Sequence, residues 1–146
     1  MVKKSILFIC IHNSARSQMA EGLFRHYYGK KYDVYSAGSD PQGIHPFSIQ
    51  VLAEIGIDIS KHKSKNLNEF GGHEMDYVVT VCGDGEKACP FFAGSKNYIH
   101  KSFEDPSAFN GAEEDKIKHF RSVRDELKKW LDEFYIKNFE DMILGD

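Results

Sequence analysis

The sequence predicts an α/β protein built on a doubly wound, four-stranded parallel sheet flanked by helices. Short apolar runs that are typical of buried strands alternate with longer segments whose apolar residues recur at helical spacing. Such alternation favours a parallel sheet, because a helix carries the chain from the end of one strand to the start of the next. Chemically reactive side chains follow several of the strand-like runs, and ligands of such sheets bind beyond the carboxyl ends of the strands.

The strands are expected where the chain is most apolar and β-branched. The first run, residues 4–9, is almost continuously apolar, which indicates a strand buried on both faces. Glycine or proline punctuates the chain between the runs. The expected strands are residues 4–9, 33–37, 76–81 and 98–100.

The helices are expected between and after these strands. Residues 17–28 repeat apolar side chains every three or four positions, with Ser17 as a candidate N-cap. Pro46 is suited to open a second helix that Gly56 closes. Residues 67–70 suggest one helical turn, and residues 113–134 form a long amphipathic pattern.

Length and composition place limits on the class of protein. The 146 residues are expected to form one domain, 1–146, in which the tail 137–146 carries no readable signal. A net charge of −3 argues against a nucleic-acid-binding surface, and no apolar run is long enough to cross a membrane. A cytoplasmic protein is expected, in which three cysteines raise the question of redox chemistry more than of structural cross-linking.

A cysteine and an arginine bracket the loop between the first strand and the first helix. If this loop curls, its backbone N–H groups converge and hold a tetrahedral oxyanion with help from the following helix. Arg16 can grip two oxygens of such an anion, while the same positive field favours the reactive thiolate form of Cys10. The residues expected to bind the anion are Ile11, His12, Asn13, Ser14, Ala15, Arg16 and Ser17.

A plainer interpretation of Cys10 is a small buried apolar residue, since free cysteines often pack in cores. A cysteine and an arginine six positions apart also arise by chance. The position between a strand and a helix start favours the catalytic interpretation, with Cys10 as nucleophile.

Cys82 and Cys89 enclose a loop that contains two glycines. A loop of this length can close to the distance that a disulfide needs. Zinc binding is disfavoured because ligand spacing such as C-x2-C is missing, and two unrelated thiols remain an alternative. Three cysteines would suit a relay in which Cys10 attacks a substrate, Cys82 attacks the Cys10 sulfur, and Cys89 attacks Cys82.

Asp105 stands before Pro106, just after the last expected strand. It could protonate an oxygen that leaves the substrate, or it could be an ordinary turn residue. Cys10, Cys82 and Asp105 each follow a strand and are therefore expected at one edge of the sheet.

These residues resemble a known family. Cys10, five intervening residues, Arg16 and Ser17, together with the late pair Asp105-Pro106, resemble the low-molecular-weight protein tyrosine phosphatases. Cys82 and Cys89 narrow the resemblance to the thioredoxin-coupled arsenate reductases. Further similarity lies in residues 17–22, 35–38, 58–60, 78–80 and 121–126, so the resemblance covers about residues 4–134.

The resemblance implies a reaction and a role in it for each of these residues. Cys10 would attack arsenate held by Arg16 and the loop amides, and Asp105 would protonate the leaving hydroxyl. Asn13 and Ser17 would order the loop and stabilise the Cys10 thiolate. Cys82 and Cys89 would form a disulfide that thioredoxin reduces, with no metal or organic cofactor.

The chain departs from the family at several positions. His12 stands where members often have glycine, and Ala15 where they often have cysteine. Some members bind potassium beside the loop; here residues 60–65 carry three lysines, so a lysine is expected to neutralise Glu21 in its place and no metal is expected. The tyrosines that follow Asp-Pro in the phosphatases are missing.

The sequence is compared with three candidate functions. A thioredoxin-coupled arsenate reductase uses all three cysteines, whereas a phosphatase for phosphotyrosine or small phosphoesters needs only Cys10, Arg16 and Asp105. Arsenate and phosphate are near-isosteres, so chemistry and not binding separates the two. A redox-sensing or binding module is disfavoured, because it would leave Arg16 and Asp105 without a role.

Overall fold

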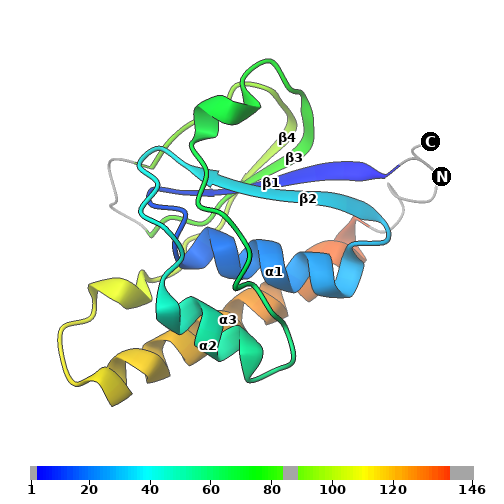
Figure 1. The fold of residues 1–146 in the computed structure, drawn as a ribbon. Helices are drawn as coiled ribbons and strands as arrows, with labels where there is room; N and C mark the ends of the chain where they lie inside the picture. Colours follow the sequence, from blue (N-terminus) through cyan, green and yellow to red (C-terminus); the bar gives the residue numbers. More distant parts are fainter. Residues whose placement is uncertain (1–2, 84–88, 139–146) are drawn as a thin grey trace.

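The structure is a computed structural model that describes residues 3–83 and 89–138. Within them, one four-stranded sheet has the strand order β2-β1-β3-β4, and every neighbouring pair is parallel. Figure 1 shows the elements in sequence colours. They are β1 (Lys4–Cys10), α1 (Arg16–Tyr28), β2 (Tyr32–Gly38), α2 (Pro46–Ala53), the single 3-10 turn η1 (Leu67–Phe70), β3 (Met75–Thr80), β4 (Ser95–His100), the 3-10 turn η2 (Pro106–Ala108) and α3 (Glu113–Lys137).

The predicted fold class is confirmed, and each expected strand and helix is present with ends shifted by a few residues. The chain passes from β1 to β2 on one side and returns to β3 on the other side of β1. This reversal makes the carboxyl end of β1 the topological switch point of the sheet, where ligands of open α/β proteins bind. Residue 10 is the last residue of β1, so the cysteine loop begins at that point.

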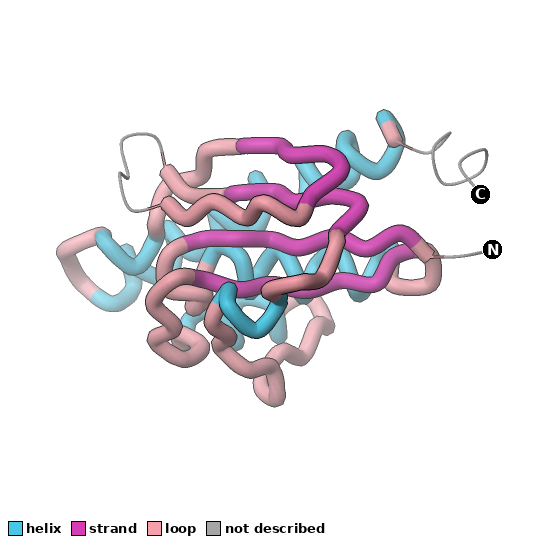
Figure 2. The backbone as a smooth tube through the Cα atoms, turned by 90° about the horizontal axis from the view of Figure 1, so that it is seen from above, coloured by secondary structure: helices cyan, strands magenta, loops and turns pink. Residues whose placement is uncertain are grey.

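The two faces of the sheet are covered differently. In the described part of the chain, α1, α2 and α3 all lie on one face, and η1 lies on the other, as Figures 1 and 2 show. Alternate residues of β1 face the two sides, Ile6 and Phe8 toward the helices and Leu7 and Ile9 toward the second face. The side chain of Phe92 packs in this second core with Met75 and Val78 of β3.

The start of α1 corrects one expectation. The helix begins at Arg16 with Ala15 at the N-cap position and no capping side chain, so Ser17 is not the cap. Its hydroxyl lies instead 2.8 Å from the sulfur of Cys10. The first N–H groups of α1 are therefore left without a capping side chain, which is the arrangement that an anion-binding helix start requires.

The second expected helix is also present. α2 begins at Pro46 and is capped by His45, whose Nδ1 accepts from the N–H of Phe47 at 3.0 Å. None of the helices within residues 3–83 and 89–138 is long and apolar enough to cross a membrane. Most of the expected glycine-rich loop 83–90, and most of the tail 137–146, lie outside the described residues.

Candidate active site

The loop after β1 is held from outside by its carbonyl groups. Four consecutive carbonyls accept hydrogen bonds from residues beyond the loop. Ile11 O accepts from Asp40 N at 2.9 Å, and His12 O accepts from Gln42 N at 3.0 Å. Ser64 Oγ lies 3.1 Å from His12 O and 2.9 Å from Asn13 O and donates to them. Ser14 O accepts from His45 N and from Ser48 Oγ, each at 3.0 Å.

The direction of these carbonyls determines where the loop amides point. In a trans peptide unit the C=O and the N–H lie on opposite sides of the chain. Because the carbonyls of residues 11–14 are bonded outward, the N–H groups of residues 12–15 face the interior of the loop. The expected ring of inward amides is thus supported by the hydrogen bonds on its outer side, and it can hold a tetrahedral oxyanion.

Asn13 forms the hub of the loop. It has a positive φ of 47°, a conformation that asparagine tolerates better than most residues. Its Nδ2 donates to Ser17 Oγ at 2.8 Å and to Ser36 Oγ at 2.9 Å. Its Oδ1 accepts from Gln18 Nε2 at 2.9 Å and from Lys65 N at 2.8 Å. The whole hydrogen-bonding capacity of this buried side chain is used, which fixes the curl of the loop.

Cys10 is buried at the floor of the loop, with 2% of its surface exposed, and it remains a free thiol. Its sulfur lies 2.8 Å from Ser17 Oγ. Since Asn13 donates to that oxygen, the single proton of the Ser17 hydroxyl is available to the sulfur. A hydroxyl that donates to sulfur favours the negatively charged, nucleophilic form of the cysteine.

Glu21 is linked to Asn13 through the hydroxyl of Ser36, and two cations, Arg25 and Lys65, lie beside its carboxylate. The hydroxyl of Ser36 donates to Glu21 Oε1, and Arg25 Nη1 lies 2.7 Å from Oε2. His62 Nδ1 and Lys65 Nζ each lie 3.6 Å from the carboxylate. Burial is the main cause that lowers the pKa of His62, and nearby Arg25 and Lys65 lower this pKa further against the opposing effect of Glu21.

The position of Lys65 confirms the expectation that a lysine neutralises Glu21. Among the described residues, no group of three or more His, Cys, Asp or Glu side chains is arranged to hold a metal ion.

Arg16 and Asp105 meet across the site. The Arg16 side chain is 3% exposed; its Nη1 donates to the carbonyl of Phe103 at 3.1 Å, and its Nη2 lies 3.7 Å from Asp105 Oδ2. The other oxygen of Asp105, Oδ1, accepts from Ser107 N at 3.0 Å and from Ser107 Oγ at 2.7 Å. Ser107 therefore orients the carboxyl group so that Oδ2 faces Arg16.

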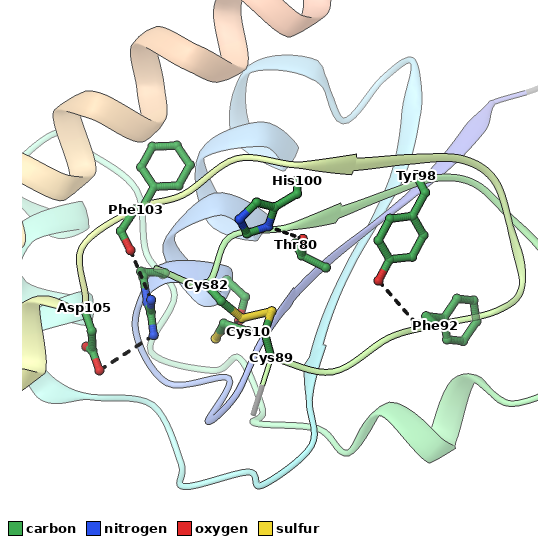
Figure 3. The surroundings of a disulfide bond; sticks show 11 residues. Cys10, Thr80, Cys82, Cys89, Phe92, Tyr98, His100, Phe103 and Asp105 are labelled. Atoms are coloured by element: carbon green, nitrogen blue, oxygen red, sulfur yellow. Dashed lines mark hydrogen bonds and ion pairs between the residues drawn. A yellow bond between two sulfur atoms is a disulfide. The ribbon is translucent and has the colours of Figure 1, made fainter. Parts of the chain in front are cut away.

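Cys82 and Cys89 form a disulfide, with 6.0 Å between their Cα atoms. This observation decides among the alternatives of a disulfide, a zinc site and two unrelated thiols. The N–H of Val81 donates to Ile9 O at 2.9 Å, so Cys82 follows β3 directly beside the end of β1. Figure 3 shows the disulfide at the same edge of the sheet as Cys10. Cys82 is the half of the disulfide that lies nearer to Cys10. The expected gathering of Cys10, Cys82 and Asp105 is present.

His12 lies on the outer side of the loop. Its side chain is 43% exposed and turns toward Asp40, with Nδ1 3.5 Å from Oδ2 and 3.2 Å from the carbonyl oxygen of the same residue. The imidazole is therefore engaged by Asp40, so the loop accommodates this bulkier residue at its rim.

Several residues of the site carried no readable sequence signal. Phe103 contributes a backbone carbonyl, which any residue could supply. His45, Ser48 and Ser64 hold loop carbonyls from segments 31 to 52 positions away. Similarly, Gly38 must lack a side chain, because a Cβ there would lie 2.4 Å from Ile11 O.

Comparison with known proteins agrees with this geometry. Residues 5–141 match the family model described as low molecular weight phosphotyrosine protein phosphatase. The chain belongs to this family, whose fold and cysteine loop it has. Several curated relatives are named arsenate reductases: that of Halalkalibacterium halodurans is 42% identical over 134 residues, which cover 92% of this chain and 96% of the relative.

Solved structures place it in the same group. An arsenate reductase in the phosphate-binding state superposes with a TM-score of 0.78 at 31% identity, covering 92% of this chain and 98% of that one. A thioredoxin-dependent arsenate reductase of Corynebacterium glutamicum has a TM-score of 0.61 at 35% identity, covering 89% of this chain and 62% of that chain.

Proposed function

We propose that this protein reduces arsenate to arsenite through Cys10, Cys82 and Cys89, and that thioredoxin returns it to the reduced state. The observation that carries the proposal is a free Cys10 inside an oxyanion loop beside a closed Cys82–Cys89 disulfide. This is the state in which such a relay ends, with the nucleophile regenerated and two electrons withdrawn from the other two cysteines.

The reaction proceeds in three thiol steps. The thiolate of Cys10 attacks arsenic in the bound arsenate, and a hydroxyl leaves as water with a proton from Asp105. Cys82 then attacks the Cys10 sulfur, which forms a Cys10–Cys82 disulfide and leaves the electron pair of the As–S bond on arsenic, so that arsenite departs. Cys89 attacks Cys82, which closes the observed disulfide and frees Cys10.

The other residues bind and orient the substrate. Arg16 and the inward amides of residues 12–15 bind the oxyanion, and the Asn13–Ser17 pair holds the loop and stabilises the thiolate. The reaction requires no metal or organic cofactor in this proposal, since an external dithiol supplies both electrons. Thioredoxin as that dithiol is supported by the thioredoxin-dependent relative, and a cytoplasmic location is consistent with such a partner.

A second activity is favoured by the family to which the chain belongs. Cys10, Arg16 and Asp105 are sufficient for hydrolysis of a phosphoester, because phosphorus takes no electrons from thiols. We therefore expect weak phosphatase activity that is independent of Cys82 and Cys89.

The deciding experiment measures arsenate turnover with and without a thioredoxin system, followed by mapping of the oxidised cysteines by mass spectrometry. The wild-type protein should turn over repeatedly only with the reductant. Cys82→Ser and Cys89→Ser should each abolish repeated turnover with arsenate yet retain hydrolysis of p-nitrophenyl phosphate. Equal loss of both activities in these variants, or free thiols throughout after one turnover, would contradict the relay.

A further inference from the structure

We propose that the exposed aromatic pair Phe91 and Tyr98 is the docking surface for the dithiol protein that reduces the Cys82–Cys89 disulfide. The inference rests on the proposed function and adds to it the surface that receives the reductant. It starts from the exposure of the two sulfur-bearing residues. Cys82 is completely buried, whereas Cys89 is partly exposed, so an incoming thiolate meets the Cys89 end of the disulfide.

The aromatic pair lies next to that end. Phe91 follows Cys89 by two residues, and its side chain is 72% exposed. Tyr98, on the edge strand β4, is 40% exposed, and the two rings stack with centroids 5.0 Å apart and planes inclined by 25°. A lone exposed aromatic residue is ordinary, but two stacked exposed rings form a larger apolar patch, and Phe91 brings this patch within two residues of Cys89 along the chain.

The pair is held in place by the segment that carries it. The backbone N–H of Phe92 lies 3.4 Å from the hydroxyl of Tyr98 and donates to it, as Figure 3 shows. The side chain of Phe92 is 7% exposed and packs in the core on the second face of the sheet. The chain between Cys89 and β4 is therefore anchored on both sides of Phe91, which limits the ordering cost of binding.

The surroundings indicate the chemistry of the partner. A hollow of about 440 Å³ is lined in part by Phe91, together with Leu67, Phe92 and Ala93, and its ionisable lining residues are His73 and Glu74. The nearby Lys96 lies 3.5 Å from Glu74 and 3.6 Å from Asp76, so its charge is offset within the protein. Among the described residues, the hollow and the exposed rings beside it are therefore mainly apolar. An apolar patch of this kind fits a dithiol protein whose reactive cysteine is surrounded by apolar side chains.

The electron balance requires a dithiol from this partner. Its first thiolate attacks Cys89, forms a mixed disulfide and releases Cys82 as a thiol once protonated; its second thiol then attacks the mixed disulfide and releases Cys89. Two electrons pass to this protein, and the partner leaves as a disulfide. Aromatic residues at the centre of an interface contribute a large share of binding free energy, so removal of Phe91 should slow the first attack.

The test compares two reductants on the oxidised protein. We expect Phe91→Ala to lower the second-order rate constant for reduction by thioredoxin about ten-fold, and to change reduction by dithiothreitol less than about two-fold, because the small molecule needs no docking surface. Phe91→Tyr, which keeps the ring, should restore the thioredoxin rate. Ile136→Ala is the matched control, because Ile136 is equally exposed at 72% but lies on α3.

Three results would overturn the inference, and they are distinguishable. Thioredoxin reduction at the wild-type rate in Phe91→Ala would refute the docking surface alone. An equal slowing with both reductants would assign Phe91 to the local geometry of the disulfide. Failure of thioredoxin to reduce the wild-type protein, while dithiothreitol succeeds, would contradict the proposed function itself.

Discussion

The sulfur of Cys10 and the hydroxyl oxygen of Ser17 lie 2.8 Å apart at the floor of the loop, seven residues apart in the chain. Asn13 donates to the same hydroxyl oxygen, also at 2.8 Å. The contact with Asn13 does not use the hydroxyl proton, so Ser17 can donate that proton to a Cys10 thiolate. This pairing explains why Ser17 stands inside the first turn of α1 and does not cap it.

Replacement of Ser17 by alanine should slow the first chemical step. A hydrogen bond to a charged group contributes about 1.5–3 kcal/mol, which corresponds to a loss of about 10- to 150-fold at neutral pH. Single-turnover arsenite release and the rate of alkylation of Cys10 by iodoacetamide would measure the effect. The exposed Ser60→Ala serves as control, and unchanged alkylation in Ser17→Ala would contradict the assigned role.

Asp105→Asn tests the proton donor. Asparagine keeps an oxygen for Ser107 but cannot protonate a leaving hydroxyl, so the first step should slow by about 100-fold or more. Binding of phosphate should persist or tighten, because the variant removes a negative charge 3.7 Å from Arg16. Calorimetric titration with phosphate and single-turnover kinetics separate the two effects. Loss of phosphate binding would assign Asp105 a structural role.

Stability should fall as the pH drops below about 6.5, in part through His45. Burial is the main cause that lowers the pKa of His45; nearby Lys116 lowers it further, and Asp105 opposes this effect. The folded protein therefore keeps His45 neutral, with Nδ1 accepting from Phe47 N, while the unfolded chain takes up a proton below its own higher pKa. The contribution of His45 is fully present above that unfolded-state pKa.

Urea denaturation at pH 7.5 and pH 5.0 checks this dependence. His45→Asn keeps an N-cap acceptor that does not titrate, so this variant should lose less stability between the two pH values than the wild-type protein. If both proteins lose the same free energy of unfolding, His45 is not among the groups responsible.

Potassium should have no specific effect on this protein. The ammonium of Lys65 already lies 3.6 Å from Glu21 Oε1, and Arg25 is bonded to the other carboxylate oxygen. Activity and thermal stability should therefore be equal in KCl and NaCl at the same ionic strength. Lys65→Met should reduce stability by about 1 kcal/mol, because Arg25 still pairs with the buried carboxylate. A stimulation by KCl alone in the wild-type protein would contradict this arrangement.

Much of the site was predictable because its parts are local in sequence. Cys10 and Arg16 bracket one turn between a strand and a helix, and periodicity alone located both elements. The position of Asp105 after β4 was predictable from topology, but its orientation was not, because Ser107 and Arg16 together determine it. The stacking of Phe91 on Tyr98 was not predictable, because the two rings come from a loop and an edge strand that only the fold brings together.

The sequence by itself determined the alternation of strands and helices, the parallel sheet, and the placement of three reactive residues at the ends of strands. These properties follow from apolar periodicity and chain connectivity, which are local. The tertiary structure decided how the loop is held, since its carbonyls are bonded by His45, Ser48 and Ser64 from distant segments. It also decided that Cys82 pairs with Cys89 beside a free Cys10, because a disulfide depends on which sulfur atoms the folded chain brings together.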